Sequence, residues 1–290
     1  MAPASPFDRV RFKEAVRWLE KRGYRVTYDS GIFSSEGYLA GSDERRRSEF
    51  LRAWKDPHSR AILTARGGYG SIRLLPLSLP KKSRPKIFMG LSDLTVLLNH
   101  VSKSTGMVTV HGPVLAGEMF RKLSENLRDK LYRKLESGEP TVLSAPRDFR
   151  IFRSGHARGR IWGGNLSTIQ STLSTPFEIP FKGAFLFLEE VCEPEYRIDR
   201  MCAQLALSGA FKRIHALLLG QFTDLRNQPH SRRWIESLVR RYLPGRRIPI
   251  LTGIQAGHGR NEVLFPIGGT ARIEHNGRRL WLSPLVGKNR

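Results

Sequence analysis

The sequence predicts an α/β protein in two parts: a parallel sheet with helices on both faces, followed by a mixed, β-rich α/β domain. Three observations predict this fold class. Over the first 120 residues, short apolar stretches alternate with amphipathic ones, which is typical of parallel strands connected by helices. A charged helical stretch and two prolines, within residues 116–146, then interrupt the pattern. Beyond them lie several continuously apolar stretches and a hairpin signal, His275-Asn-Gly277.

The elements of the first part follow from the spacing of their apolar residues. Residues recurring at intervals of three and four indicate helices, whereas short runs or strict alternation indicate strands. Gly23 and Gly106 follow two of the helices at the C-cap position, and Asp56-Pro57 ends the other. In chain order we expect a helix over 14–19, a strand over 24–28, a helix over 42–54, strands over 61–65 and 87–89, and a helix over 93–101.

The second part has longer apolar runs and more turns. We expect strands over 184–188, 215–219, 248–251, 263–265, 270–274 and 279–282, and helices over 198–205 and 234–242. The charged segment 116–137 indicates helix, and the proline-containing segment after it indicates a junction. The predicted organisation is an α/β domain over 1–120, a helical linker over 121–155 and a mixed α/β domain over 156–290.

The charge balance is strongly basic. Lys and Arg number 49 against 26 Asp and Glu, which gives a formal net charge of +23 and a pI near 10.9. Such a balance favours a polyanionic partner such as nucleic acid. The basic residues are nevertheless spread along the whole chain, without a block of five like charges. We therefore interpret the charge mainly as a solvated, arginine-rich surface, and nucleic-acid binding is a distant alternative.

Composition also constrains the compartment. No apolar run reaches the ~18 residues of a membrane span, and the first residues show no basic segment followed by an apolar one. The two cysteines, Cys192 and Cys202, are too few for a disulfide framework and lack the further ligands of a zinc site. We expect a cytoplasmic protein, without membrane or secretory segments, in which both cysteines are reduced core thiols.

Ser92 is a candidate nucleophile. It lies in Gly90-Leu-Ser-Asp-Leu-Thr95, between a buried strand and an amphipathic helix, where a sharp turn would expose its hydroxyl at the carboxyl edge of the sheet. The start of the helix offers free main-chain N–H groups to a developing oxyanion. The motif departs from Gly-x-Ser-x-Gly, because Asp93 and Leu94 fill the last two places. Taken alone, Ser92 is explained more simply as the N-cap of that helix.

A nucleophilic serine needs a base, an orienting acid and oxyanion donors. The glycine-rich loop 66–70 follows a strand and matches no phosphate-binding motif, so it fits either an oxyanion loop or a plain turn. His258, flanked by two glycines, and His111, before a rigid Gly-Pro turn, are the candidate bases. Glu189 and Glu190 both end an apolar strand, and strand alternation does not decide which of them orients the base.

Six motifs follow one another along most of the chain, from about Tyr38 to Leu282. They are Arg66-Gly-Gly-Tyr-Gly70, Gly90-Leu-Ser-Asp-Leu-Thr95, His111-Gly-Pro113, Trp162-Gly-Gly-Asn165, Leu188-Glu-Glu190 with residues 193–200, and Gly257-His-Gly259. In this order they resemble the motifs of the LD-carboxypeptidase family, which includes murein tetrapeptide carboxypeptidases and microcin C immunity peptidases.

The resemblance implies a fold, a reaction and a triad. The fold would be a Rossmann/flavodoxin-like domain followed by a swivelling-type domain. The reaction would be hydrolysis of an L,D-amide bond, releasing terminal D-alanine from a murein tetrapeptide during cytoplasmic peptidoglycan recycling, with no metal or cofactor. Carried over motif by motif, the nucleophile is Ser92, the base is His258 and the acid is Glu189, because the family's glutamate is the first acidic residue after the strand.

The resemblance also implies positions around the triad. Main-chain N–H groups of Gly68 and Asp93 would form the oxyanion hole. The substrate is a small peptide that ends in carboxylates, so the cationic candidates for binding it are Arg66, Arg197 and Arg200. Trp162 and Asn165 are further candidates from a junction loop. For each of these five side chains, salt bridges or core packing explain its presence equally well.

Two departures and several alternatives accompany the resemblance. Family members usually have a short strand before the turn that matches residues 1–5, so we expect one strand of the first sheet to be missing. Leu91 replaces a frequent Tyr or His, with the loss of a hydrogen bond near the nucleophile. A peptidyl-nucleotide hydrolase of the microcin C type is the alternative substrate assignment. An inactive scaffold is disfavoured by the intact triad motifs, and a homodimer is one oligomeric state that we consider.

Overall fold

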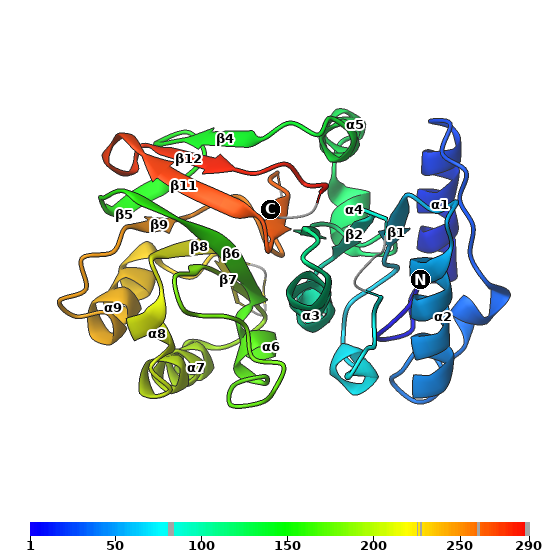
Figure 1. The fold of residues 1–290 in the computed structure, drawn as a ribbon, viewed down its shortest axis with the longest axis horizontal. Coiled ribbons are helices and arrows are strands. Elements are labelled where there is room, and N and C mark those ends of the chain that lie inside the picture. Colours follow the sequence, from blue (N-terminus) through cyan, green and yellow to red (C-terminus); the bar gives the residue numbers. More distant parts are fainter. Residues whose placement is uncertain (81–83, 225, 227, 260–261, 288–290) are drawn as a thin grey trace.

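The computed structural model describes residues 1–80, 84–224, 226, 228–259 and 262–287. Within them the chain builds two β-sheets, one in each half of the molecule (Figure 1). The smaller sheet has the strand order β1-β2-β3-β10 and the larger has the order β4-β12-β11-β6-β7-β8-β9-β5. Strands β1 to β3 pair in parallel, as do β6 to β9, so the predicted α/β fold class is confirmed.

The first half joins its three parallel strands through helices. Its elements are α1 (Arg9–Glu20), the 3-10 turn Ser30–Phe33, α2 (Asp43–Lys55), β1 (Ala61–Leu63), the 3-10 turn Ser71–Leu74, β2 (Ile87–Gly90), the 3-10 turn Ser92–Leu94, α3 (Thr95–Thr105), β3 (Thr109–His111), α4 (Glu118–Lys122) and α5 (Glu125–Glu136). Helices α1 and α2 lie along the outer side, whereas α3 lies between the two sheets (Figure 1). There Asn99 Nδ2 donates to the carbonyl of Gly163 at 2.8 Å, so α3 joins the two halves.

The second half is built on the larger sheet. Its elements are β4 (Thr141–Ser144), β5 (Arg150–Arg153), β6 (Ala157–Asn165), α6 (Leu166–Gln170), β7 (Phe185–Val191), α7 (Glu195–Leu207), α8 (Ala210–Arg213), β8 (Ala216–Thr223), α9 (Arg232–Tyr242), β9 (Ile250–Thr252), β10 (Phe265–Ile267), β11 (Thr270–Glu274), the 3-10 turn His275–Gly277 and β12 (Arg279–Leu282). Strands β11 and β12 pair antiparallel, as the hairpin signal predicts.

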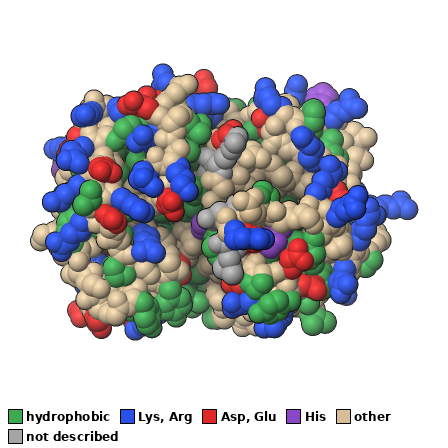
Figure 2. Space-filling model, turned by 180° about the vertical axis from the view of Figure 1, so that it is seen from behind, with side chains coloured by type: hydrophobic (Ala, Val, Ile, Leu, Met, Phe, Trp, Pro, Cys, Tyr) green, Lys and Arg blue, Asp and Glu red, His purple; other side chains and the backbone are tan. Residues whose placement is uncertain are grey.

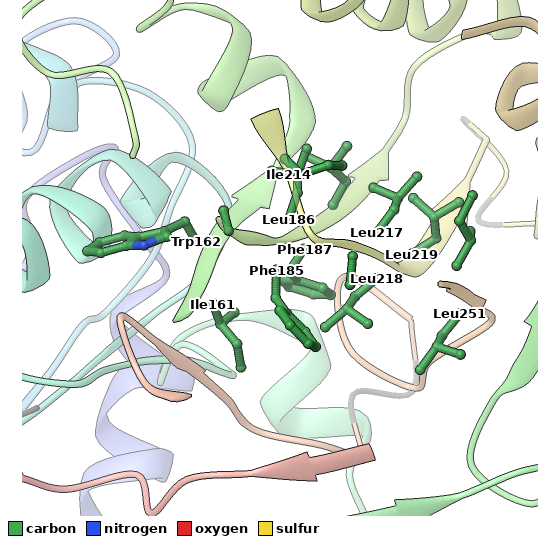
Figure 3. Packing of buried hydrophobic residues seen from close by; sticks show 14 of the residues in the cluster. Ile161, Trp162, Phe185, Leu186, Phe187, Ile214, Leu217, Leu218, Leu219 and Leu251 are labelled. Carbon is green, nitrogen blue, oxygen red and sulfur yellow. The ribbon is translucent and has the colours of Figure 1, made fainter. Parts of the chain in front are cut away.

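The core of the second half lies on the central strands β6, β7 and β8. Phe185, Phe187 and Leu218 are completely buried and belong to one cluster with the inward residues of the neighbouring elements (Figure 3). Phe187 also stacks on Phe265 of β10, with ring centroids 4.2 Å apart. Because β10 pairs with His111 and its neighbours in β3, this stack ties the core of the larger sheet to an edge of the smaller one.

Several local expectations are wrong. Residues 24–28 form no strand; Tyr24 and Val26 pack against the first-half core, but no neighbouring strand offers them a ladder. Segment 121–155, expected to be a helical linker, contains β4 and β5 after α5, and both strands extend the larger sheet. Cys202 is buried, but Cys192 is exposed, because it lies in the turn just after β7.

At the N-terminus, the main chain of Met1 runs beside β1. The Met1 amino group donates to Leu63 O at 2.9 Å, and Ala65 N donates to Met1 O at 2.8 Å. Ser5 N donates to Gly67 O at 3.3 Å. Residues 1–5 therefore support the segment that continues from β1 into the glycine-rich loop.

The surface shows how the charged side chains are distributed, and the lengths of the helices show whether any of them could span a membrane. Figure 2 shows Lys and Arg side chains over both halves of one face, with Asp and Glu among them. In the described ranges, no helix is both long and apolar enough to cross a membrane. The basic side chains of this face are thus scattered among acidic ones, as the sequence pattern predicts.

Candidate active site

Ser92 lies at a sharp turn directly after β2. Its φ of 64° is in the left-handed region, which costs a non-glycine residue roughly 1–2 kcal/mol. The N-cap position of α3 is occupied by Leu94, so the simpler interpretation of Ser92 as a helix cap is wrong. A strained serine between a parallel strand and a helix is the geometry of a nucleophile elbow.

Two glycines make room for this turn. A Cβ on Gly90 would lie 2.7 Å from the Leu94 Cβ, and a Cβ on Gly67 would lie 2.9 Å from the Ser92 Cβ and 3.3 Å from its Oγ. Gly67 therefore leaves, from a neighbouring loop, the space that the last glycine of Gly-x-Ser-x-Gly usually leaves. The glycine-rich loop and the serine, 25 residues apart in sequence, lie in contact.

Two charged side chains, Arg46 and Asp93, hold the glycine-rich loop in place. The completely buried guanidinium of Arg46 donates to Gly70 O at 2.9 Å and to Gly41 O at 3.2 Å. Asp93 accepts from Ser71 N at 2.8 Å, and burial raises the pKa of this carboxyl despite that hydrogen bond. Sequence reasoning missed both roles, since burial of a charged side chain cannot be read from helical spacing.

The expected oxyanion donors are the main-chain N–H groups of Gly68, in the glycine-rich loop, and of Asp93, next to Ser92. Among the hydrogen bonds of the described residues, none uses the main-chain N–H of Gly68. Asp93 is in the first turn after Ser92, where main-chain N–H groups have no acceptor within the helix. Neither N–H group therefore has an acceptor among the described residues.

Glu189 and His258 form a close pair in the second half. The Glu189 carboxylate, at the end of β7, is completely buried, and its Oε2 lies 2.6 Å from His258 Nδ1. Since a carboxylate only accepts, His258 carries its proton on Nδ1 and leaves Nε2 free to act as a base. Burial alone raises the pKa of Glu189, but His258, together with the nearby His111, outweighs it and lowers that pKa to about 2. Burial likewise lowers the pKa of His258, but Glu189 raises it above the ordinary value.

Both glycines next to His258 are required by close contacts. Gly257 has φ of 126°, and a Cβ there would lie 2.9 Å from Glu189 Oε2. The N–H of Gly259 donates to Gln221 Oε1 at 2.8 Å, and a Cβ on Gly259 would clash with that amide. The close packing of the loop at both glycines thus holds the His258 imidazole within hydrogen-bond distance of the Glu189 carboxylate.

Gly257→Ala tests this placement. We expect kcat to fall about 100-fold, because the new methyl displaces Glu189 from His258 by a fraction of an ångström or more. Gly253→Ala is the matched control, because Gly253 also has a positive φ, of 70°, but a Cβ there meets nothing within 4 Å. Steady-state kinetics and thermal unfolding of both variants make the comparison. Equal losses of activity in the two variants would contradict the proposed contact.

The serine and the acid–base pair lie at the same ends of the two sheets. Thr95, at the start of α3, accepts from Asn165 N at 3.0 Å through its Oγ1, and Asn165 pairs with Glu189 across β6 and β7. His111 brings a second imidazole, with its Nε2 3.7 Å from Glu189 Oε1. In the described part of the chain, no hydrogen bond joins Ser92 to His258, and such contacts often tighten only when substrate binds.

The structure distinguishes Glu190 from Glu189. Glu190 accepts from Asn165 Nδ2 and Ser167 N, each at 2.7 Å, and from Val191 N at 2.9 Å. Burial, followed by the Glu189 charge, raises the pKa of Glu190. The contacts with Asn165 and Ser167 hold the end of β6 and the start of α6, whereas Glu189 contacts an imidazole.

The predicted substrate-binding side chains make contacts of their own within the protein. Asn165 is buried and caps α6, accepting from Thr168 N at 3.2 Å. Arg197 pairs with Glu193 at 3.1 Å, Arg66 donates to Pro6 O at 2.9 Å, and Arg200 lies over the Tyr196 ring.

Trp162 is a buried member of the core cluster, and its ring lies to one side of the other labelled side chains (Figure 3). It lines a cavity of about 390 Å³ together with Lys103, Gly106, Arg160 and Lys182. This cavity is at the far end of α3 from Ser92. No cluster of three or more potential metal ligands occurs among the residues that the structure describes.

Comparison with known proteins identifies the family. Residues 1–112 match the LD-carboxypeptidase N-terminal domain and residues 158–273 match the LD-carboxypeptidase C-terminal domain. The chain belongs to the LD-carboxypeptidase family. As a member, it is a serine-type LD-carboxypeptidase, as the resemblance of its motifs predicts.

Relatives with curated names support this membership. The chain is 34% identical, over 281 residues, to the "probable murein peptide carboxypeptidase" of Bacillus subtilis, covering 94% of this chain and 87% of the relative. It is 30% identical, over 289 residues, to the "murein tetrapeptide carboxypeptidase" of Pseudomonas aeruginosa, covering 95% and 92%.

Solved structures share the fold of this LD-carboxypeptidase. The muramoyltetrapeptide carboxypeptidase of Oxalobacter formigenes is 28% identical with a TM-score of 0.81, covering 98% of this chain and 97% of that one. The microcin C7 self-immunity protein MccF, in complex with glutamyl sulfamoyl guanosine, is 22% identical with a TM-score of 0.84, covering 98% and 94%. The second likeness concerns the fold alone.

Proposed function

We propose that this LD-carboxypeptidase releases the terminal D-alanine of murein tetrapeptide through a Ser92–Glu189–His258 triad. The observation that carries the proposal is the 2.6 Å contact between the buried Glu189 carboxylate and His258 Nδ1. It fixes the imidazole in the tautomer that can accept a serine proton through Nε2. The names of the Bacillus, Pseudomonas and Oxalobacter relatives favour a murein peptide as the substrate.

The mechanism follows from the positions of these groups. Ser92 Oγ attacks the carbonyl carbon of the L,D-amide while His258 Nε2 takes the hydroxyl proton. The N–H groups of Gly68 and Asp93 stabilise the oxyanion of the tetrahedral intermediate. The intermediate then expels the D-amino acid, whose amine takes the proton from His258. Water, deprotonated by His258, hydrolyses the acyl-enzyme and returns Ser92 to its hydroxyl form.

Mass spectrometry of a purified murein tetrapeptide incubated with the protein tests the proposal. We expect a product that has lost one alanine, and no such product with Ser92→Ala. An unchanged tetrapeptide under conditions where the protein is folded would overturn the substrate assignment.

Two further experiments test the cellular role and the oligomeric state. Accumulation of the tetrapeptide in the cytoplasmic fraction of a deletion strain tests the proposed place in cytoplasmic recycling. Sedimentation tests the predicted homodimer.

A peptidyl-nucleotide substrate is the second candidate, favoured by one feature of the surface. Tyr38 and Tyr69 are 62% and 48% exposed, and their ring centroids lie 5.7 Å apart, with Tyr69 in the glycine-rich loop itself. Such an aromatic pair offers a face on which a base can stack. Incubation with glutamyl sulfamoyl guanosine, the ligand in the MccF structure, distinguishes the candidates. Cleavage of this compound in preference to the tetrapeptide would favour the second one.

A further inference from the structure

His111, at the end of β3, is completely buried but has no hydrogen-bond partner for either ring nitrogen among the described residues. Its ring packs edge-on against Phe187, with centroids 5.2 Å apart. Buried imidazole nitrogens are usually paired, because an unpaired one loses its hydrogen bonds to water and gains none in return. Packing alone therefore does not explain why a histidine, with two ring nitrogens unpaired in the described part of the chain, is buried at this position.

A second unpaired polar atom faces this imidazole. Glu189 Oε1 is buried without a hydrogen bond, and it lies 3.7 Å from His111 Nε2. The other oxygen, Oε2, accepts from His258. Glu190, the remaining titratable neighbour, turns its carboxylate away toward Asn165 and the main chain. One catalytic carboxylate thus lies between two imidazoles, of which only one is within hydrogen-bond distance.

We propose that His111 is a positioning residue whose Nε2–H donates to Glu189 Oε1 during the reaction and holds the carboxylate toward His258. This proposal rests on the proposed triad. Closing the 3.7 Å separation to about 3 Å requires a shift of less than an ångström. The imidazole acts as a neutral donor, because a second proton on the buried Nδ1 would find no acceptor.

A hydrogen bond from His111 would assist the proton transfer from Ser92 to His258. When His258 takes the proton of Ser92, it becomes an imidazolium beside Glu189, and the proton must stay on the imidazole rather than move to the carboxylate. A hydrogen bond to Oε1 stabilises the ionised carboxylate and so opposes that transfer. It also prevents the carboxylate from rotating about its side chain, which would break the contact through Oε2.

The position of His111 also connects the two halves of the site. In the smaller sheet it pairs with Gly90 on one side and with Phe265 on the other. Gly90 is two residues before Ser92, whereas Glu189 belongs to the larger sheet. A contact between His111 and Glu189 therefore fixes the acid relative to the strand that carries the nucleophile.

The test compares two replacements of similar size. His111→Gln keeps an N–H donor near the position of Nε2, whereas His111→Met fills the space without one. We expect His111→Met to lower kcat about 10- to 100-fold with little change in KM, and His111→Gln to restore most of the loss. His100→Gln is the control, because His100 lies in α3 and contacts Leu77 O rather than the triad.

Proton NMR provides a readout that needs no substrate. The His258 Nδ1 proton, in its short hydrogen bond to Glu189, should give a far-downfield resonance in the wild type and in His111→Gln. We expect it to broaden or move upfield in His111→Met while the melting temperature shows a folded protein. Wild-type kcat with an unshifted resonance in His111→Met would overturn the proposal, as would equal defects in both folded variants. Lack of tetrapeptide cleavage by the wild type with this NMR pattern intact would instead refute the proposed substrate.

Discussion

Ser92→Ala should lower kcat for the tetrapeptide by about 10⁵- to 10⁶-fold, because no other hydroxyl occupies the elbow after β2. The loss is close to complete since the attacking atom itself is removed, while the loop donors and the binding surface stay in place. Single-turnover measurements with the purified variant give the residual rate. A residual rate within tenfold of the wild type would show that Ser92 is not the nucleophile.

Two further variants separate chemistry from folding. Ser104→Ala, in α3, removes a hydroxyl that donates to His100 O, and it should leave kcat within about twofold. Ser92→Gly should be as inactive as Ser92→Ala but more stable, because glycine tolerates the φ of 64° at no cost. We expect its free energy of unfolding to rise by about 1 kcal/mol. Thermal unfolding of the three variants measures this difference, and a lower stability of Ser92→Gly than of Ser92→Ala would contradict the strain at this residue.

The local elements were largely predictable from sequence, whereas the pairing between distant ones was not. Apolar spacing predicts α2 because it buries one face, and it also predicts α3, although that helix is buried on most sides between the two sheets. The continuous runs predict β7 and β8 because both faces are covered. The partner of a strand leaves no such local signal. Strand β10 joins the smaller sheet although its neighbours in sequence lie in the larger one, and residues 24–28 alternate like a strand but find no partner.

The proposed triad could be inferred from sequence only through the resemblance of its motifs. Physical reasoning from sequence finds Ser92 and His258 at suitable turns, but each has a simpler explanation when considered alone. Glu189 and Glu190 cannot be separated, since both are buried at the end of β7, where the pairing with β8 is irregular. Arg46 and the Asp93 side chain were missed because their roles depend on hydrogen bonds to main-chain groups far away in sequence.

Glu189→Gln should lower kcat about 10⁴-fold and move the acid limb of the pH profile to lower pH. The amide can donate its N–H to His258 Nδ1, which would place the imidazole proton on Nε2 and block acceptance of the Ser92 proton. Because Glu189 raises the pKa of His258, the wild type should lose activity as the pH falls through a value above 6.5, when the base becomes protonated. Without the carboxylate that pKa falls. The dependence of kcat/KM on pH for both proteins measures the shift, and an unmoved acid limb would contradict the pairing.

Glu190→Gln is the matched control, because it makes the same change one residue along the strand. Glu190 accepts hydrogen bonds from three N–H groups, of Asn165, Ser167 and Val191, so a glutamine there turns an N–H toward a donor. We expect a loss of about 2 kcal/mol in the free energy of unfolding, with kcat within tenfold of the wild type. The acid limb should move much less than in Glu189→Gln, because Glu190 is the smaller of the two contributions to the raised pKa of His258. The two substitutions are thus expected to have opposite effects: Glu189→Gln lowers activity, whereas Glu190→Gln lowers stability. The reverse pattern would assign the orienting acid to Glu190 and require a different conformation of the His258 loop.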